Sequence, residues 1–193
     1  MNQKNTKYVV RGKTISISFL VLLFIIGCGG AKPYITPYKY QENQLAVLLY
    51  DRAMTYQNQK NYELAIIEFR HFLDYYPKIY NADEAQLNIA KCYQSLRQFN
   101  EAINNYKLFL KKYKQSDHKV EAIYRMGECY RESNEFKKAT EIYLSIIKEH
   151  FKTEWAKKAK DKIQELANKF PKSKEFKKIN KQADKTYRKK QKM

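Results

Sequence analysis

Apolar residues recur along this chain at the spacing of helix faces, and the pattern repeats every 37 residues. Three copies of the pattern begin at Tyr50, Leu87 and Tyr124. One helix face in the first copy is formed by residues spaced three, four and three apart, which are Tyr62, Ala65, Phe69 and Phe72. A second apolar face precedes it in each copy, so each copy predicts a helical hairpin.

The three copies agree in kind at equivalent positions. Small residues recur in the first helix at Ala53, Ala90 and Gly127, and in the second helix at Ala65, Ala102 and Ala139. Tyrosine recurs at Tyr56, Tyr93 and Tyr130, and an aromatic residue opens each second helix at Tyr62, Phe99 and Phe136. Small residues let two helix backbones approach, and the large rings fill the grooves beside them. One hairpin cannot bury both of its faces, so the hairpins must stack.

The segments on either side of the repeats differ from them in composition. Residues 154–170 carry Trp155, Ala159, Ile163 and Leu166 at helical spacing, which predicts a capping helix that ends at Pro171. Residues 171–193 form a basic tail with few apolar residues, and we expect frayed helix or disorder there. Residues 29–42 contain two prolines and no helical pattern, so residues 28–45 are expected to be a tether.

The N-terminus has the form of a secretory signal peptide. Residues 1–13 are polar and basic, and residues 14–27 are apolar or small, without charge, and too short for a comfortable membrane span. The run ends in Ile25-Ile26-Gly27-Cys28, which resembles the bacterial lipobox. That resemblance implies cleavage after residue 27, acylation of Cys28 and stable attachment to a bilayer. The alternative is an uncleaved anchor, which would not need a small residue before the cysteine.

The repeats resemble tetratricopeptide repeats, which have a small–Tyr…Ala–aromatic…Pro pattern and a period of 34. Pro77 fits the closing proline, whereas Lys114 and Phe151 replace it in the later copies. The resemblance implies an all-α fold of about three stacked hairpins, at residues 46–82, 83–119 and 120–153, in a right-handed superhelix with a capping helix. Scarce Gly (5) and Pro (4) in 193 residues agree with a mostly helical chain.

Charge is concentrated at the C-terminus. The formal net charge is +18, and the segment from Lys172 onward holds ten basic residues against Glu175 and Asp184. Lysine and tyrosine together attract nucleic acid, but export would remove the protein from it. An anionic bilayer surface or peptidoglycan is the nearer target, and a merely solvated tail is the other interpretation.

The sequence offers no catalytic constellation. His71, His118 and His150 lack the paired spacing of metal ligands, and the chain has no HExxH, CxxC or phosphate-binding glycine loop. Cys92 and Cys129 lie one repeat apart, farther than a disulfide spans if neighbouring helices pack at about 8–10 Å. We therefore expect two buried cysteines, no enzyme activity, no cofactor or metal, and no small-molecule substrate.

The concave groove of the superhelix is the expected working surface. In tetratricopeptide proteins, certain first-helix positions line this groove. By that resemblance the partner-binding residues here are Tyr50, Met54, Leu87, Lys91, Tyr124, Glu128 and Arg131. The basic clamp with which some members hold a C-terminal carboxylate is absent, and a mixed apolar and polar groove suits an extended segment or a loop. These positions could also be ordinary exposed helix residues.

Two families share this plan. Lipobox, short tether and immediate repeats resemble the BamD-like lipoproteins of the outer-membrane β-barrel assembly machine. Three repeats and an Ala/Lys-rich closing helix are similar to the Tol–Pal periplasmic coordinator, which is normally not lipidated. The lipobox favours the first family, and Gly29 in place of Asp favours the outer membrane. The resemblance implies a periplasm-facing scaffold, anchored by lipid, whose partners are envelope proteins rather than nucleic acid. Another envelope adaptor and a cell-wall enzyme are the remaining alternatives.

Overall fold

The computed structural model describes residues 9–10, 13–14 and 37–192, and the chain divides into two compact units, residues 1–36 and 37–193. In the first unit, β1 (Val9–Val10) pairs antiparallel with β2 (Lys13–Thr14), and Val9 lies opposite Thr14. The expected lipidation site at Cys28 and most of the expected signal peptide lie outside the described residues.

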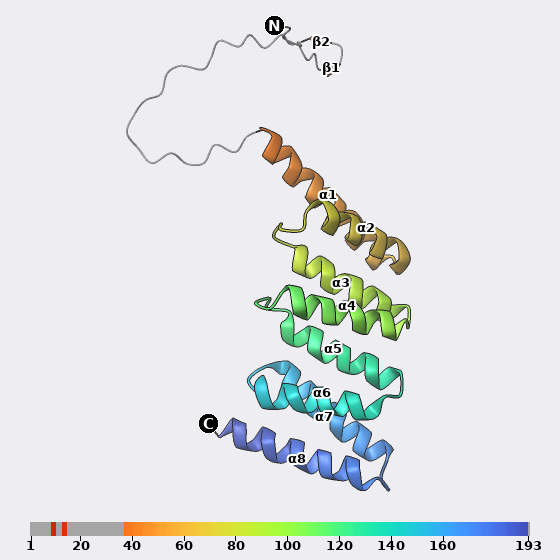
Figure 1. Ribbon diagram of the computed structural model, residues 1–193, viewed down its shortest axis with the longest axis vertical. Helices are drawn as coiled ribbons and strands as arrows, with labels where there is room; N and C mark the ends of the chain where they lie inside the picture. The colour runs from red at the N-terminus through yellow and green to blue at the C-terminus, as the bar shows by residue number, and fades with distance from the viewer. Residues whose placement is uncertain (1–8, 11–12, 15–36, 193) are drawn as a thin grey trace, which may run out of the picture. The chain divides into compact units, whose positions relative to one another are not determined.

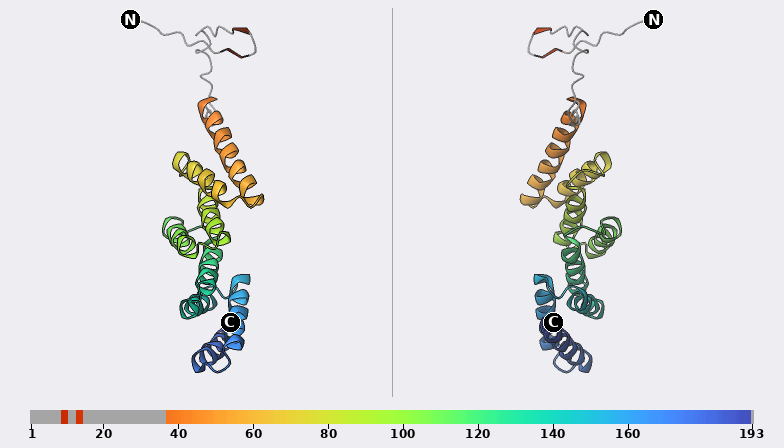
Figure 2. Two further views of the ribbon diagram at one scale, coloured as in Figure 1. Left: turned by 90° about the vertical axis from the view of Figure 1, so that its right-hand side faces the viewer. Right: turned by 90° about the vertical axis from the view of Figure 1, so that its left-hand side faces the viewer.

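The second unit consists of helices that each pack against the next (Figure 1). They are α1 (Pro37–Asn58), α2 (Tyr62–Tyr75), α3 (Ala82–Ser95), α4 (Phe99–Lys112), α5 (Lys119–Glu132), α6 (Phe136–Glu149), α7 (Glu154–Lys169) and α8 (Lys174–Gln191). Successive pairs form four hairpins, and in the side views of Figure 2 α2, α4 and α6 lie along one side of the stack. The predicted all-α fold of stacked hairpins is confirmed, and the second helices begin at the three predicted aromatic residues.

The turn inside each of the first three hairpins has the same backbone geometry. Lys60, Arg97 and Asn134 stand 37 residues apart, and each has a positive φ of about 60°. In each turn the following N–H donates to a carbonyl five residues earlier, as from Asn61 to Tyr56 at 2.9 Å. This is the Schellman closure, which favours glycine at the left-handed position because that conformation costs other residues about 1–2 kcal/mol. The repeat seen in the side chains therefore recurs in the backbone.

Small residues in the repeat are required by the close packing within each hairpin. Ala53, Ala90 and Ala102 are completely buried. Gly127 stands in the third hairpin at the position of Ala53 and Ala90. A Cβ added to Gly127 would lie 2.7 Å from Cε1 of Tyr143. The Tyr143 ring thus occupies the space that a side chain would need, and only glycine fits there.

The two ends of the stack differ from the sequence-based expectation. Instead of a frayed tail after a single capping helix, α8 forms a fourth hairpin with α7 and also contacts α6. Ser173 caps this helix by accepting a hydrogen bond from the Phe176 backbone N–H at 3.3 Å, and the Phe176 ring stacks on Phe170 at 5.1 Å. At the other end, α1 begins at Pro37 within the expected tether, because proline suits the first turn of a helix.

Candidate partner-binding surface

The first expected groove column, which contains Tyr50, Leu87 and Tyr124, packs into the interior of the stack. Leu87 is completely buried and Tyr50 is 9% exposed, with its ring edge-on to Phe72 at 5.4 Å. Tyr124 is half-buried, and its ring lies 5.2 Å from that of Trp155. The prediction that Leu87 is an exposed contact residue is wrong, because the neighbouring hairpin covers it.

The second expected column carries polar links between helices. Lys91 on α3 forms an ion pair with Glu121 on α5 at 2.9 Å, and Arg125 reaches the same carboxylate at 2.7 Å. Burial alone would raise the pKa of Glu121, but the hydrogen bonds from Arg125 and Lys91 outweigh it, so that the pKa is lowered. Met54 accepts a hydrogen bond from the Asn88 amide at 3.4 Å. Lys91 and Met54 therefore have internal partners rather than free ends.

The third hairpin carries a similar network around Glu128. The Tyr143 hydroxyl donates to the Glu128 carboxylate, and Arg131 pairs with that carboxylate at 3.2 Å. Arg131 also pairs with Glu132 and reaches Glu165 on α7 at 4.0 Å. Burial raises the pKa of Tyr143, so its hydroxyl stays protonated and donates at all physiological pH values. The structure thus brings Glu128 and Arg131 together in a network that links α5, α6 and α7.

Another column shows one incomplete link. Tyr106 donates its hydroxyl to the Gln94 side chain at 2.8 Å. In the first hairpin the equivalent residues are Phe69 and Gln57. Phe69 has no hydroxyl, and the Gln57 side-chain oxygen is buried without a hydrogen-bond partner among the described residues. The first hairpin therefore lacks a bond that the second one makes.

An apolar pocket lies where the connection between α2 and α3 meets α1. Its volume is about 310 Å³, and it is lined by Ala46, Val47, Tyr50, Asp51, Phe72, Ile79, Tyr80 and Asn81. Val47 is 58% exposed and Tyr80 is 93% exposed, so the mouth of the pocket is apolar and open. The Tyr50 hydroxyl is buried, and its burial together with the nearby Glu84 carboxylate raises its pKa. Exposed apolar groups of this kind mark interaction surfaces.

The apolar mouth of this pocket does not recur in the second and third hairpins. One repeat later, Val47, Ile79 and Tyr80 correspond to Glu84, Ser116 and Asp117, and two repeats later to Glu121, Thr153 and Glu154. Polar residues thus replace all three apolar ones in both later hairpins. Comparison of these columns in the sequence would have revealed the pocket, but Ile79 and Tyr80 precede α3 and were not among the expected groove residues.

Two further exposed leucines lie on another side of α1. Leu45 is 50% exposed and Leu48 is 60% exposed, and they are three residues apart on the helix. We refer to Val47 and Tyr80 together with the pocket as the α1 apolar surface.

Other chemistry is sparse in the described residues. Cys92 and Cys129 are buried, as predicted, and burial raises the pKa of each thiol to about 12. Within the described ranges no three His, Cys, Asp or Glu side chains are grouped to hold a metal ion. None of the helices in those ranges is long and apolar enough to cross a membrane.

Comparison with known proteins places the chain in a family. Its residues 42–189 match the YfiO family, which is described as an outer membrane lipoprotein. Two solved structures of nearly identical TPR-like repeats from a candidate kinesin light chain of Podosopora anserina, one of them a point variant, share the fold. Each has a TM-score of 0.56. The point variant is 11% identical, over 83% of this chain and 80% of its own. The other structure is 12% identical, over 84% of this chain and 81% of its own. None of the curated proteins matches. The predicted BamD-like family is thus confirmed, and this chain belongs to the YfiO family of outer membrane lipoproteins.

Proposed function

We propose that this protein is a membrane-anchored scaffold that binds other envelope proteins during the assembly of outer-membrane proteins. The observation that carries the proposal is the α1 apolar surface, where Val47 and Tyr80 are exposed at positions that are acidic in the later hairpins. A stack built only to be soluble would have acidic or polar residues there, as the second and third hairpins do. Family membership supports a role at the outer membrane.

The pocket suits one apolar side chain of an extended partner segment. Its volume of about 310 Å³ is at the lower end of ligand sites, and Tyr80 can close over a side chain inserted beside Val47. Lys91, Glu128 and Arg131 are held by ion pairs inside the stack. They therefore contribute less to binding a partner than free side chains in the groove would.

The test exchanges the apolar mouth for the residues of the second hairpin. A photo-crosslinking amino acid at Leu48 should capture outer-membrane assembly proteins, which mass spectrometry identifies. In the double variant Val47→Glu, Tyr80→Asp, we expect this capture to be lost. Loss of such an anchor typically costs about 2 kcal/mol or more, which is roughly a thirtyfold loss of affinity. Thermal stability should stay near wild type because both side chains are exposed.

The matched control is Leu108→Glu, which places a charge at an exposed leucine on α4. It should leave the crosslinks unchanged. If the Val47→Glu, Tyr80→Asp protein still crosslinks to the same proteins at wild-type yield, the α1 apolar surface is not the contact. Crosslinks to proteins with no part in outer-membrane assembly would refute the assembly role while keeping the contact.

We also propose that Cys28 carries the lipid. The lipobox-like sequence before it and the family support this assignment. Cys28→Ser should leave the signal peptide attached and abolish labelling by an alkyne fatty acid, whereas Cys129→Ser should label normally. Unchanged labelling of the Cys28→Ser protein would contradict the assignment.

A further inference from the structure

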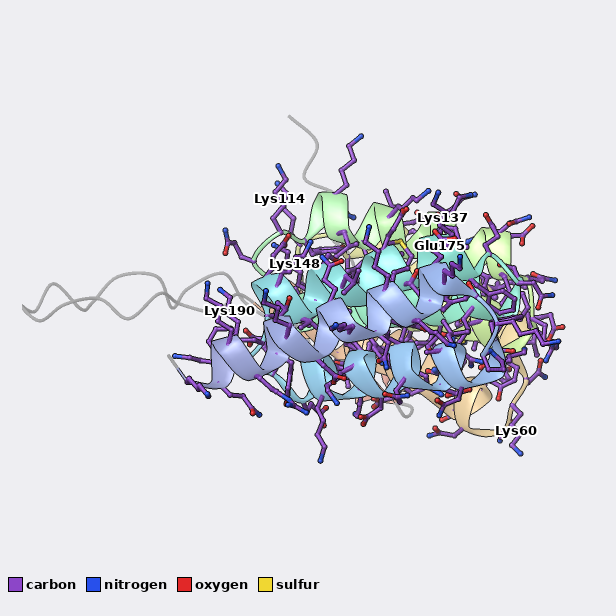
Figure 3. The ribbon with its side chains drawn as sticks, turned by 90° about the horizontal axis from the view of Figure 1, so that it is seen from below. Lys60, Lys114, Lys137, Lys148, Glu175 and Lys190 are labelled. Carbon is purple, nitrogen blue, oxygen red and sulfur yellow. The ribbon has the colours of Figure 1, made fainter. Side chains whose placement is uncertain are left out.

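The last helix, α8, uses its apolar face inside the fold. Phe176, Ile179 and Tyr187 pack against the core formed with α6 and α7, and Ala183 is completely buried. These residues recur every three or four positions, so they occupy one side of the helix. Figure 3 looks onto α8 from the end of the stack, with Glu175 near its first turn and Lys190 near its last. The opposite side of α8 therefore faces solvent.

That solvent-facing side is densely cationic. Five exposed basic residues line or flank one shallow depression together with Asp184, and they are Lys181, Lys185, Arg188, Lys189 and Lys192. Asp184 already pairs with Lys160 at 3.0 Å, so its charge is compensated from α7. Within residues 37–192, none of the five basic residues forms an ion pair. We call these five residues the α8 cationic face.

We propose that the α8 cationic face binds the phosphate headgroups of an anionic lipid bilayer. The five charges extend over about 16 Å of helix, which fits a flat array of phosphates better than a single anion. A family of outer membrane lipoproteins works at a bilayer, so headgroups are the anions nearest to this face. The inference goes beyond the proposed function, because it concerns the opposite end of the stack from the α1 apolar surface.

The contact is electrostatic rather than inserted. An amphipathic helix enters a bilayer with its apolar face, but in α8 that face is already buried against α7. Basic residues near an anionic surface contribute roughly fivefold each to association, and salt screens this attraction. Since α1 and α8 lie at opposite ends of the second unit (Figure 1), a lipid before α1 and a contact at α8 would hold both ends of the stack at one membrane.

The experiment uses the full lipidated chain on vesicles. A donor dye on Gln182→Cys, an exposed site beside the α8 cationic face, reports energy transfer to acceptor lipids. Cys92 and Cys129 will not react, because burial raises the pKa of each thiol to about 12. We expect strong transfer on vesicles containing phosphatidylglycerol, weak transfer on phosphatidylcholine alone, and loss of the difference in about 0.5 M sodium chloride.

Charge reversal localises the contact. We reverse three of the charges together, with Lys181→Glu, Lys185→Glu and Lys189→Glu. On the anionic vesicles, this should lower the ratio of membrane-bound to unbound α8 by at least about 100-fold. The control reverses three exposed lysines on α4 and just beyond its end, Lys107→Glu, Lys111→Glu and Lys114→Glu, with the same change in net charge, and should keep the transfer. Flotation with phosphatidylcholine vesicles reports the lipid anchor separately.

Two results would overturn the proposal. One is equal energy transfer on phosphatidylglycerol and phosphatidylcholine vesicles. The other is an equal loss of transfer in the α4 control, which would show that only the net charge of the protein matters. An absence of transfer on phosphatidylglycerol vesicles, with α8 instead binding an acidic polymer that carries the acceptor dye, would likewise reject a bilayer as the occupant.

Discussion

Replacing Leu87 with alanine separates the folding role of the first-helix column from a binding role. Leu87 is completely buried and belongs to a cluster that includes Ala90 on its own helix, Tyr106 and Phe109 on α4, and Ala122 on α5. Its side chain therefore fills the junction between the second and third hairpins. Truncation removes apolar contacts with three helices at once.

The size of the effect follows from that environment. Leucine-to-alanine changes at buried sites cost about 2–5 kcal/mol, and the cost is greater where the surroundings cannot collapse into the cavity. Tyr106 and Phe109 beside Leu87 are already completely buried. They therefore have little room to move into the cavity that the truncation leaves. We expect a loss of about 3–4 kcal/mol, which for a unit of this size lowers the thermal midpoint by about 6 to 16 °C.

The assay is thermal unfolding followed by circular dichroism. Leu87→Met, which nearly conserves volume, should cost less than about 1.5 kcal/mol. Leu108→Ala truncates a leucine that is 47% exposed on α4 and should shift the midpoint little. A midpoint for Leu87→Ala that matches that of Leu108→Ala would refute the burial argument. Conversely, if the thermal midpoint of Leu87→Ala is lowered, a failure of this variant to bind a partner does not show that Leu87 contacts that partner.

Three further changes have defined outcomes. Phe69→Tyr should give the buried Gln57 oxygen the donor it lacks and raise stability in urea by about 1 kcal/mol. Lys60→Gly should relieve the positive φ and stabilise by about 0.5 kcal/mol, measured in the same way. Glu121→Gln should cost about 1 kcal/mol at pH 7. Because the pKa of Glu121 is lowered in the fold, its contribution is present above its ordinary value and disappears as pH falls through the folded value, so wild type and variant should converge in acid.

Much of the fold could be predicted from the sequence because its signal is repeated. Tyr62, Phe99 and Phe136 are the residues predicted to open the second helices, and each helix begins there. A single amphipathic stretch leaves its boundaries open by several residues, whereas three aligned copies constrain each other. The small residues were equally informative, since Gly127 is the position where a ring approaches the backbone.

The groove was harder to predict because burial there depends on the neighbouring hairpin. Leu87 is completely buried in a cluster that includes Ala122 of the next hairpin, so its environment depends on that neighbour. The helix α8 was missed for a different reason, since ten basic residues obscured the spacing of Phe176, Ile179, Ala183 and Tyr187. The first error arises from contacts between hairpins, which the pattern within one repeat does not encode.

The two ends of the stack solve the problem of a terminal repeat differently. A solenoid needs a polar outer face at each end to stay soluble. At the C-terminal end α8 supplies one, because its apolar residues point inward and lysines point outward. At the other end Leu45 and Leu48 on α1 stay half exposed. Because the chain finishes one end with its own hairpin and leaves the other apolar, we expect a partner protein to complete the α1 end.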